Sequence, residues 1–144
     1  MQTSSQMSSQ ASSKVPSSNV ETTVDLLRAQ LKDAGEELQI CIQNCIDCAQ
    51  SCELLIQHCL RMGGVHADPS HIRLLQDCVG ACTLSAQFML RESEFDARVC
   101  ALCSLICLRC AEDCEREPDD ETMQQCAEIC RRCANSCQEM EIAH

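Results

Sequence analysis

Five cysteines share the stretch CALCSLICLRCAEDC, residues 100–114, at steps of 3, 4, 3 and 4 residues. An α-helix turns by about 100° per residue, so these side chains would point to about 0°, −60°, −20°, −80° and −40° around its axis. All five would fall within an arc of about 80°, which makes one continuous row of sulfur. The spacing therefore predicts a helix with one thiol-lined face.

Three other segments repeat this period of 3 and 4 residues, which is typical of amphipathic helices. We expect the four helices over residues 36–63, 69–92, 94–116 and 121–142. The inner face of the second helix would carry His71, Leu75, Cys78, Cys82, Ser85 and Met89. No sustained period-2 alternation predicts a strand. The fold is therefore predicted to be all-α, an antiparallel up-down four-helix bundle with a cysteine-lined core.

The N-terminal part differs in composition from the predicted bundle. Residues 1–19 are rich in Ser and Gln and are expected to be a disordered polar segment. Residues 20–35 carry an apolar stripe that predicts a short, amphipathic leading helix, which would cap the bundle or contribute to an oligomer interface. Residues 36–144 would then form the four-helix bundle as a metal-storage domain.

Composition narrows the class of protein. Cysteine supplies 16 of the 144 residues, yet the helical spacing is unlike that of small disulfide scaffolds. The polar N-terminus has no apolar signal region and no apolar run has transmembrane length, so we expect a cytoplasmic protein with reduced thiols. The net charge of −11 disfavours nucleic acid and anionic membranes as partners.

So many cysteines on the inner faces need an explanation beyond packing. A single buried cysteine is most often a small hydrophobic residue. Sixteen of them would underfill a bundle core, at a cost of roughly 1 kcal/mol for each missing methyl-sized volume. Metal ions bound to thiolates would fill that space. An all-thiolate site is soft and selects Cu(I), Zn(II) or iron–sulfur clusters.

The commonest unit in the chain is C-x3-C, and it favours Cu(I) among these metals. The seven copies are Cys41/Cys45, Cys48/Cys52, Cys78/Cys82, Cys103/Cys107, Cys110/Cys114, Cys126/Cys130 and Cys133/Cys137. Side chains four residues apart on a helix lie about 5–6 Å from one another. Two metal–sulfur bonds of roughly 2.3 Å each span this gap nearly in line, so one helix could chelate a two-coordinate ion. Each Cu(I) also cancels the charge of one thiolate.

With these motifs the chain resembles the bacterial copper storage proteins, particularly their cytosolic branch. The resemblance covers roughly residues 38–140 and is carried by CIQNCIDCAQSCELLIQHCL (41–60), CVGAC (78–82), CALCSLICLRCAEDC (100–114) and CAEICRRCANSC (126–137). It implies storage or buffering of many Cu(I) ions, on the order of one per cysteine, in a homotetramer rather than catalysis. Copper chaperones or small Cu(I) complexes would be the partners. Leu55 stands where similar sequences can carry a further cysteine, and His71 stands in place of another.

The predicted copper ligands are all sixteen cysteines together with His71, which shares the stripe of Cys78 and Cys82. They are Cys41, Cys45, Cys48, Cys52, Cys59, His71, Cys78, Cys82, Cys100, Cys103, Cys107, Cys110, Cys114, Cys126, Cys130, Cys133 and Cys137. His58 lies off the main stripe and is expected at the surface.

The two ends of the bundle would differ. The connector after the first helix and the turn before the last helix share one end, which would gather Met62, His66, His71, Cys114 and Met123. Thioether and imidazole are weaker Cu(I) ligands than thiolate, so we expect copper to enter there. Phe88 and Phe95 would plug the core at the opposite end, with Met89 and Met140 nearby.

Three alternatives stay open on the sequence. A zinc or general heavy-metal buffer would bind about four Zn(II) with sixteen thiolates. An enzyme or redox sensor would use one cysteine of low pKa, but the repetition singles out no such thiol. A structural protein held together by disulfides would have almost no free thiol.

Overall fold

The computed structural model describes residues 25–26 and 35–143. The chain divides into two units, residues 1–34 and residues 35–144. Of the predicted leading helix, the structure describes only Asp25 and Leu26, which are helical, and Gly35, which precedes α3. The disorder predicted for residues 1–19 lies wholly outside them.

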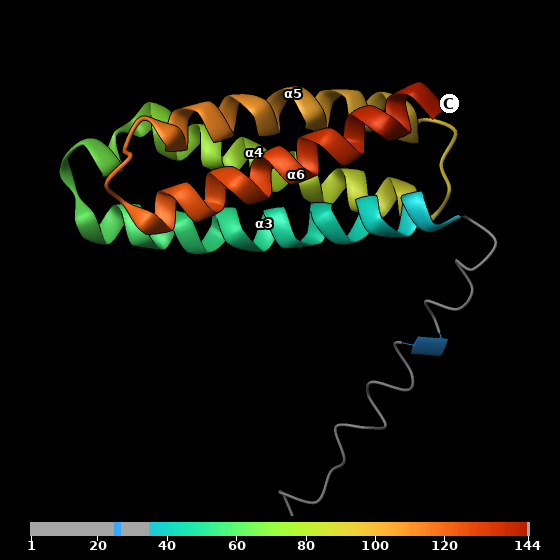
Figure 1. The fold of residues 1–144 in the computed structure, drawn as a ribbon, viewed down its shortest axis with the longest axis horizontal. Helices are drawn as coiled ribbons and strands as arrows, with labels where there is room; N and C mark the ends of the chain where they lie inside the picture. Colours follow the sequence, from blue (N-terminus) through green and yellow to red (C-terminus); the bar gives the residue numbers. More distant parts are fainter. Residues whose placement is uncertain (1–24, 27–34, 144) are drawn as a thin grey trace, which may run out of the picture. The chain divides into compact units, whose positions relative to one another are not determined.

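The second unit is a four-helix bundle (Figure 1). Its elements are α3 (Glu36–Met62), the short 3-10 helix η2 (Gly64–Ala67), α4 (Pro69–Leu90), α5 (Asp96–Glu115) and α6 (Glu121–Ala143). Each helix packs against the next, and α6 packs against α3, so the ring of helices is closed. Within residues 35–143 there is no strand. The all-α up-down bundle is confirmed, and the predicted helix ends differ from the observed ones by at most two residues.

Local sequence signals set the helix ends around the α3–α4 connection and before α6. The backbone of Gly63 has a φ of 70°, which favours glycine, and its N–H donates to the Cys59 carbonyl at 3.0 Å. Pro69 occupies the first turn of α4, where its missing N–H is no loss. At the start of α6, Asp120 Oδ1 accepts the Met123 backbone N–H at 3.0 Å and caps the helix.

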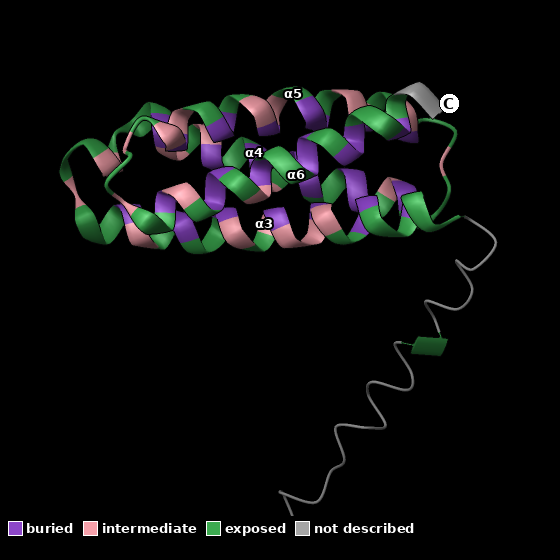
Figure 2. Cartoon of the chain, in the orientation of Figure 1, coloured by how far each residue is buried: buried purple, intermediate pink, exposed green. Residues whose placement is uncertain are grey.

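The core of the bundle is lined by sulfur. All sixteen cysteines are buried and free, and Figure 2 shows buried residues on the helix faces that look into the bundle. The six inner-face positions predicted for α4 are all buried as well. Because these faces are built at steps of 3 and 4 residues, each helix brings its cysteines to the same central axis.

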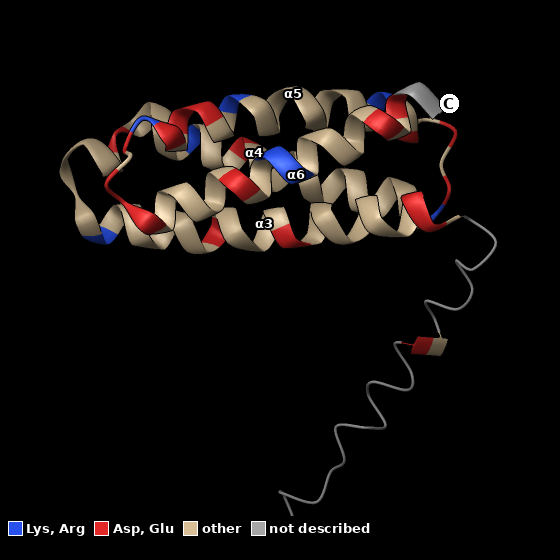
Figure 3. Ribbon diagram, in the orientation of Figure 1, with Lys and Arg blue, Asp and Glu red and all other residues tan. Residues whose placement is uncertain are grey.

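Acidic residues outnumber basic ones in the described bundle, and both are spread over its helices and turns (Figure 3). Several large apolar side chains are nevertheless exposed on α3 and α5, namely Ile40, Leu54, Leu60, Leu102 and Leu105. Among the residues that the structure describes, no helix has both the length and the apolar character needed to cross a membrane.

The prediction that two phenylalanines plug one end of the core is wrong. Phe95 precedes α5 in the turn and is 54% exposed. Phe88 is half-buried and lies one residue before the inward-facing position 89, so its ring turns outward, where the Arg91 guanidinium lies 4.9 Å from the ring centroid. Met89 and Met140 are buried, as expected. The flexible thioether side chains fill this end instead.

Candidate metal centre

The cysteine side chains form one continuous row of thiols along the bundle axis, which we call the thiol channel. It comprises Cys41, Cys45, Cys48, Cys52, Cys59, Cys78, Cys82, Cys100, Cys103, Cys107, Cys110, Cys114, Cys126, Cys130, Cys133 and Cys137. Neighbouring sulfur atoms lie close together: Cys82 Sγ is 3.5 Å from Cys107 Sγ, and Cys48 Sγ is 3.6 Å from Cys130 Sγ. Except for Cys126, at 4% exposure, every thiol residue is fully buried.

Within the thiol channel, several sets of thiols converge closely enough to share a metal ion. Their sulfur atoms lie within 4.8 Å of one another in each set. The sets are Cys45/Cys103/Cys133/Cys137, Cys48/Cys82/Cys107/Cys133, Cys48/Cys52/Cys78/Cys130 and Cys41/Cys100/Cys137. Cys48, Cys133 and Cys137 each belong to two sets. Sharing of this kind links the sets into one chain of sites along the bundle.

The short sulfur contacts run mainly between helices. Cys103 and Cys107 are a same-helix C-x3-C pair at 3.8 Å, but Cys41 and Cys45 each contact Cys137 of α6, at 3.7 and 3.6 Å. The C-x3-C spacing predicted an ion between two thiols of one helix. The closed ring of helices also brings sulfur atoms of different helices within 4 Å of one another.

The sulfur separations suit thiolates that share one small cation. Three thiolates bonded at roughly 2.3 Å around a planar ion would lie about 4.0 Å apart. The contacts of Cys52 with Cys126 and with Cys130, both 3.9 Å, match that spacing closely. The metal-free packing is therefore already near the geometry of bridged metal–thiolate sites.

Hydrogen bonds between the thiols shift their pKa values in opposite directions. The pKa of Cys48 is lowered because Cys107 and other thiols donate hydrogen bonds to its thiolate. One turn further along α3, the pKa of Cys52 is raised because its own S–H is donated to neighbours such as Cys110. A thiolate is stabilised only while its neighbours keep their protons. Complete ionisation of the channel therefore requires cations in place of the departing protons.

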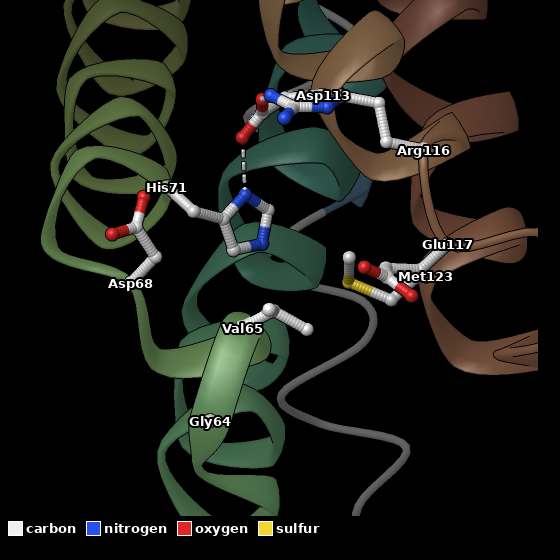
Figure 4. A pocket seen from close by; sticks show the side chains of 8 residues that line it. All are labelled: Gly64, Val65, Asp68, His71, Asp113, Arg116, Glu117 and Met123. Carbon is white, nitrogen blue, oxygen red and sulfur yellow. Dashed lines mark hydrogen bonds and ion pairs between the residues drawn. The ribbon is translucent and has the colours of Figure 1, made fainter.

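A pocket of about 340 Å³ opens at the end of the bundle where α3 joins α4 (Figure 4). Its lining includes Val65, Asp68, His71, Asp113, Arg116 and Met123. We call this region the mouth. In Figure 4 the His71 imidazole points to the Asp113 carboxylate, with His71 Nδ1 at 2.5 Å from Asp113 Oδ2.

His71 and Met123 connect the mouth to the thiol channel. Cys59 Sγ lies 3.5 Å from His71 Nε2 and 3.7 Å from Met123 Sδ. Both side chains line the pocket, whereas Cys59 has no exposed surface. Imidazole nitrogen and thioether sulfur thus lie between solvent and the first thiol. Both atoms are competent ligands for Cu(I).

The structure brings together only part of the group predicted for this end. Cys114 and Met123 are buried there. Met62 is 56% exposed and does not line the pocket. His66 turns away from the thiols and places its Nε2 atom 2.9 Å from Asp120 Oδ2. His58, expected at the surface, is only 23% exposed and contacts the same oxygen.

Two carboxylates at this end were missed by the sequence analysis. Asp113 contacts and positions His71. Burial alone would raise the pKa of the Asp113 carboxyl, but hydrogen bonds and charges from His71 and Arg116 outweigh burial and lower that pKa. Burial likewise opposes ionisation of Asp120, but hydrogen bonds, with that from His58 the largest, hold its pKa at about 2. The capping role of Asp120 could have been predicted from the sequence, because an aspartate directly before a helical segment is a common N-cap. Asp113 carried no such signal beyond its place one residue before Cys114.

Comparison with known proteins decides the family. The profile described as Csp, copper storage protein, matches residues 34–142. The chain belongs to the copper storage protein family. The match covers the bundle up to residue 142, so the thiol channel and the mouth both lie within the matched residues.

Solved structures similar to this copper storage protein share its fold. Nmul_A1745 from Nitrosospira multiformis is 37% identical, with a TM-score of 0.71 over 76% of this chain and 98% of that one. The Cu(I)-bound copper storage protein BsCsp3 from Bacillus subtilis is 34% identical, with a TM-score of 0.69 over 74% and 99% of the two chains. A cytosolic copper storage protein from Streptomyces lividans, determined with five coppers, is 30% identical, with a TM-score of 0.65 over 74% and 93%.

Proposed function

We propose that the thiol channel stores Cu(I) in the cytoplasm, as a reserve or buffer of many ions. The observation that carries the proposal is the continuous row of sixteen buried, free thiols from four helices. Similar proteins support it: BsCsp3 is described as Cu(I)-bound, and the Streptomyces lividans protein as cytosolic and loaded with copper.

The proposed ligands are the sixteen cysteines of the thiol channel and His71. Shared thiols such as Cys48 and Cys133 would bridge neighbouring ions. Bridging allows the number of ions to approach the number of thiols, so we expect on the order of one Cu(I) per cysteine. His71 would bind an ion together with Cys59 through its Nε2 atom, 3.5 Å from the thiol.

Charge favours Cu(I) over the alternative of a zinc or general heavy-metal buffer. One Cu(I) per thiolate leaves the buried channel neutral. About four Zn(II) ions in four-thiolate sites would leave the same thiolates with roughly eight uncompensated negative charges. Buried charges without partners cost several kcal/mol each. A store built on the bundle axis, away from solvent, therefore suits the monovalent ion.

Copper would enter and leave through the mouth. An incoming Cu(I) would meet His71 and Met123 before it reaches Cys59. The first two ligands are weaker than thiolate, so each transfer inward would gain affinity. Small Cu(I) complexes or copper chaperones are the proposed donors, since the mouth leaves room for a ligand of the incoming ion to depart.

We assign no catalytic role to these cysteines. A nucleophile needs one activated thiol that a substrate can reach. Here every thiol is buried, and most contact other thiols. Cys59 instead contacts His71 and Met123, but it has no exposed surface that a substrate could reach.

We also propose a homotetramer. Exposed apolar side chains on the outer faces of α3 and α5 support an interface between copies, in particular Leu54 at 71% exposure and Leu105 at 64%. Large apolar side chains that gather on a surface commonly mark contact sites. Light scattering of the full chain tests this, with a mass of four copies expected; a monomer mass at all concentrations would contradict it.

Competition between the two metals tests the proposed function. The reduced protein is incubated without oxygen with an excess of both Cu(I) and Zn(II), then desalted, and its metal content is measured. We expect copper in more than ten equivalents and almost no zinc. Retention of about four Zn(II) with little copper would support the zinc buffer and contradict copper storage.

A further inference from the structure

A second group of potential metal ligands lies apart from the thiol channel. It consists of His58, His66 and Asp120, whose ligand atoms all lie within 4.8 Å of one another. No thiol belongs to it. The three residues come from three different elements: α3, η2 and the residue directly before α6. We call them the His-His-Asp cluster.

One carboxylate oxygen is the centre of the cluster. Asp120 Oδ2 lies 2.8 Å from His58 Nε2 and 2.9 Å from His66 Nε2. The two imidazole rings stand nearly perpendicular, at 81°, with centroids 6.1 Å apart. Both Nε2 atoms therefore converge on one point from different directions. Ligand atoms of a tetrahedral site lie about 3.3 Å apart, so each of the two Nε2–Oδ2 separations would lengthen by a few tenths of an ångström around an ion.

The cluster is sheltered and held by the fold. The side chains of His58, His66 and Asp120 are 23%, 14% and 11% exposed. The other oxygen of Asp120 accepts the Met123 backbone N–H at 3.0 Å, which fixes the carboxylate at the start of α6. Partial burial limits competition from water, while the remaining exposure leaves a route for an ion. Such ligands need little reorganisation before binding.

We propose that the His-His-Asp cluster binds one divalent cation of the Zn(II) class, separately from the Cu(I) store. Two imidazole nitrogens and a carboxylate oxygen suit borderline divalent ions, whereas a stored Cu(I) ion prefers thiolate. Three protein ligands leave a fourth tetrahedral position for water. The bound ion would join α3, the connector between α3 and α4, and the start of α6 beside the mouth.

The thiols themselves bind zinc, so the test uses full-length, tag-free protein already filled with Cu(I). The copper content is measured first; a failure to load copper would count against copper storage and not against this site. Zn(II) is then titrated without oxygen against a chromophoric zinc chelator. The variants are His58→Gln, His66→Gln and Asp120→Asn, and the control is Asp119→Asn, which makes the same charge change at an exposed neighbour. Equal copper content in every variant shows that the bundle is intact.

We expect one Zn(II) per chain in the unsubstituted protein and in Asp119→Asn, and an affinity at least about tenfold lower in the other three variants. Failure of the unsubstituted protein to bind more Zn(II) than Asp120→Asn would overturn the proposal. Equal affinity in all variants would overturn it as well, because the ion would then lie elsewhere.

Discussion

The Nε2 atom of His71 lies 3.5 Å from the Sγ atom of Cys59, while Nδ1 of the same ring lies 2.5 Å from Asp113 Oδ2. An ionised carboxylate can only accept, so the Nδ1 atom carries a proton and donates a hydrogen bond to Asp113. Nε2 is then the ring nitrogen that faces Cys59 and whose lone pair could bind a metal ion. This arrangement suits the mixed nitrogen and sulfur site that we propose at the first step into the thiol channel.

Replacement of His71 should slow copper uptake more than it reduces capacity. In His71→Gln the first imidazole ligand is lost, and we expect loading from a small Cu(I) complex to be about tenfold slower. The final copper content should fall by no more than about one ion, because the thiols remain. Stopped-flow absorbance of copper–thiolate bonds measures the rate. Met62→Leu is the matched control, since Met62 is exposed at the same end. An unchanged rate in His71→Gln would contradict copper entering past this residue.

Asp113 should act through His71 rather than on copper directly. Asp113→Asn keeps an oxygen acceptor but removes the charge, so the ring is held less firmly. We expect a smaller slowing of copper uptake than in His71→Gln. The double variant should load no more slowly than His71→Gln alone, because both changes remove one function. Additive slowing would show that Asp113 has an independent role.

The stability of the metal-free protein should fall at high pH. Burial raises the pKa of the Cys59 thiol to about 11, and the negative charge of Asp120 contributes to this rise. The folded chain then holds this proton after the unfolded chain has released its own near pH 8.5. The stabilising contribution is complete below about pH 8.5 and is lost as the pH rises through about 11. For Cys59 it is on the order of 3 kcal/mol.

Anaerobic urea denaturation of reduced protein between pH 8 and 11 measures this loss. Cys59→Ala should show a shallower decline in the free energy of unfolding than the unsubstituted chain. Copper-loaded protein should show almost none, since its thiols have already lost their protons. Identical slopes for Cys59→Ala and the unsubstituted chain would contradict the assignment to this thiol.

Asp120 should contribute to stability as a helix cap. Asp120→Ala removes the acceptor for the Met123 N–H and should lower the free energy of unfolding by about 1–2 kcal/mol. The low pKa of the Asp120 carboxyl, about 2, makes its contribution to stability depend on pH. The contribution is present above about pH 4 and declines as the pH falls towards 2. Chemical denaturation at pH 7 and pH 3 measures both effects; Asp119→Ala, exposed in the same turn, should leave stability nearly unchanged. Equal stability of the two variants would contradict the capping role.

The helices and the inward faces follow from the sequence because they rest on local periodicity. Steps of 3 and 4 residues determine which side of a helix is apolar or sulfur-lined, whatever the helix packs against. The buried positions His71, Ser85 and Met89 were predicted in this way and are confirmed. The residues that end and start helices are local signals as well, so Gly63 and Pro69 predicted the α3–α4 connection to within two residues.

The partners of each side chain depend on how the helices meet, and local periodicity does not determine that. Cys41 and Cys137 are 96 residues apart in the sequence and 3.7 Å apart in space. The phenylalanines were misplaced because an apolar side chain near a helix end was assumed to face the core. Phe88 lies one residue from the inward-facing position and so points about 100° away from it.

The contact between His58 and Asp120, beside the mouth, was not predicted for the same reason. His58 and Asp120 meet across 62 residues of sequence, and neither stands on the cysteine stripe. Only the closing of α6 against α3 brings them together.

An anaerobic titration of the reduced protein with Cu(I), in the presence of a chromophoric Cu(I) chelator, tests copper storage most directly. We expect the chelator to stay colourless until well over ten equivalents of Cu(I) have been added, with an end point near the sixteen thiols of the chain. Colour after only a few equivalents would contradict copper storage, because the thiol channel would then not be a Cu(I) store.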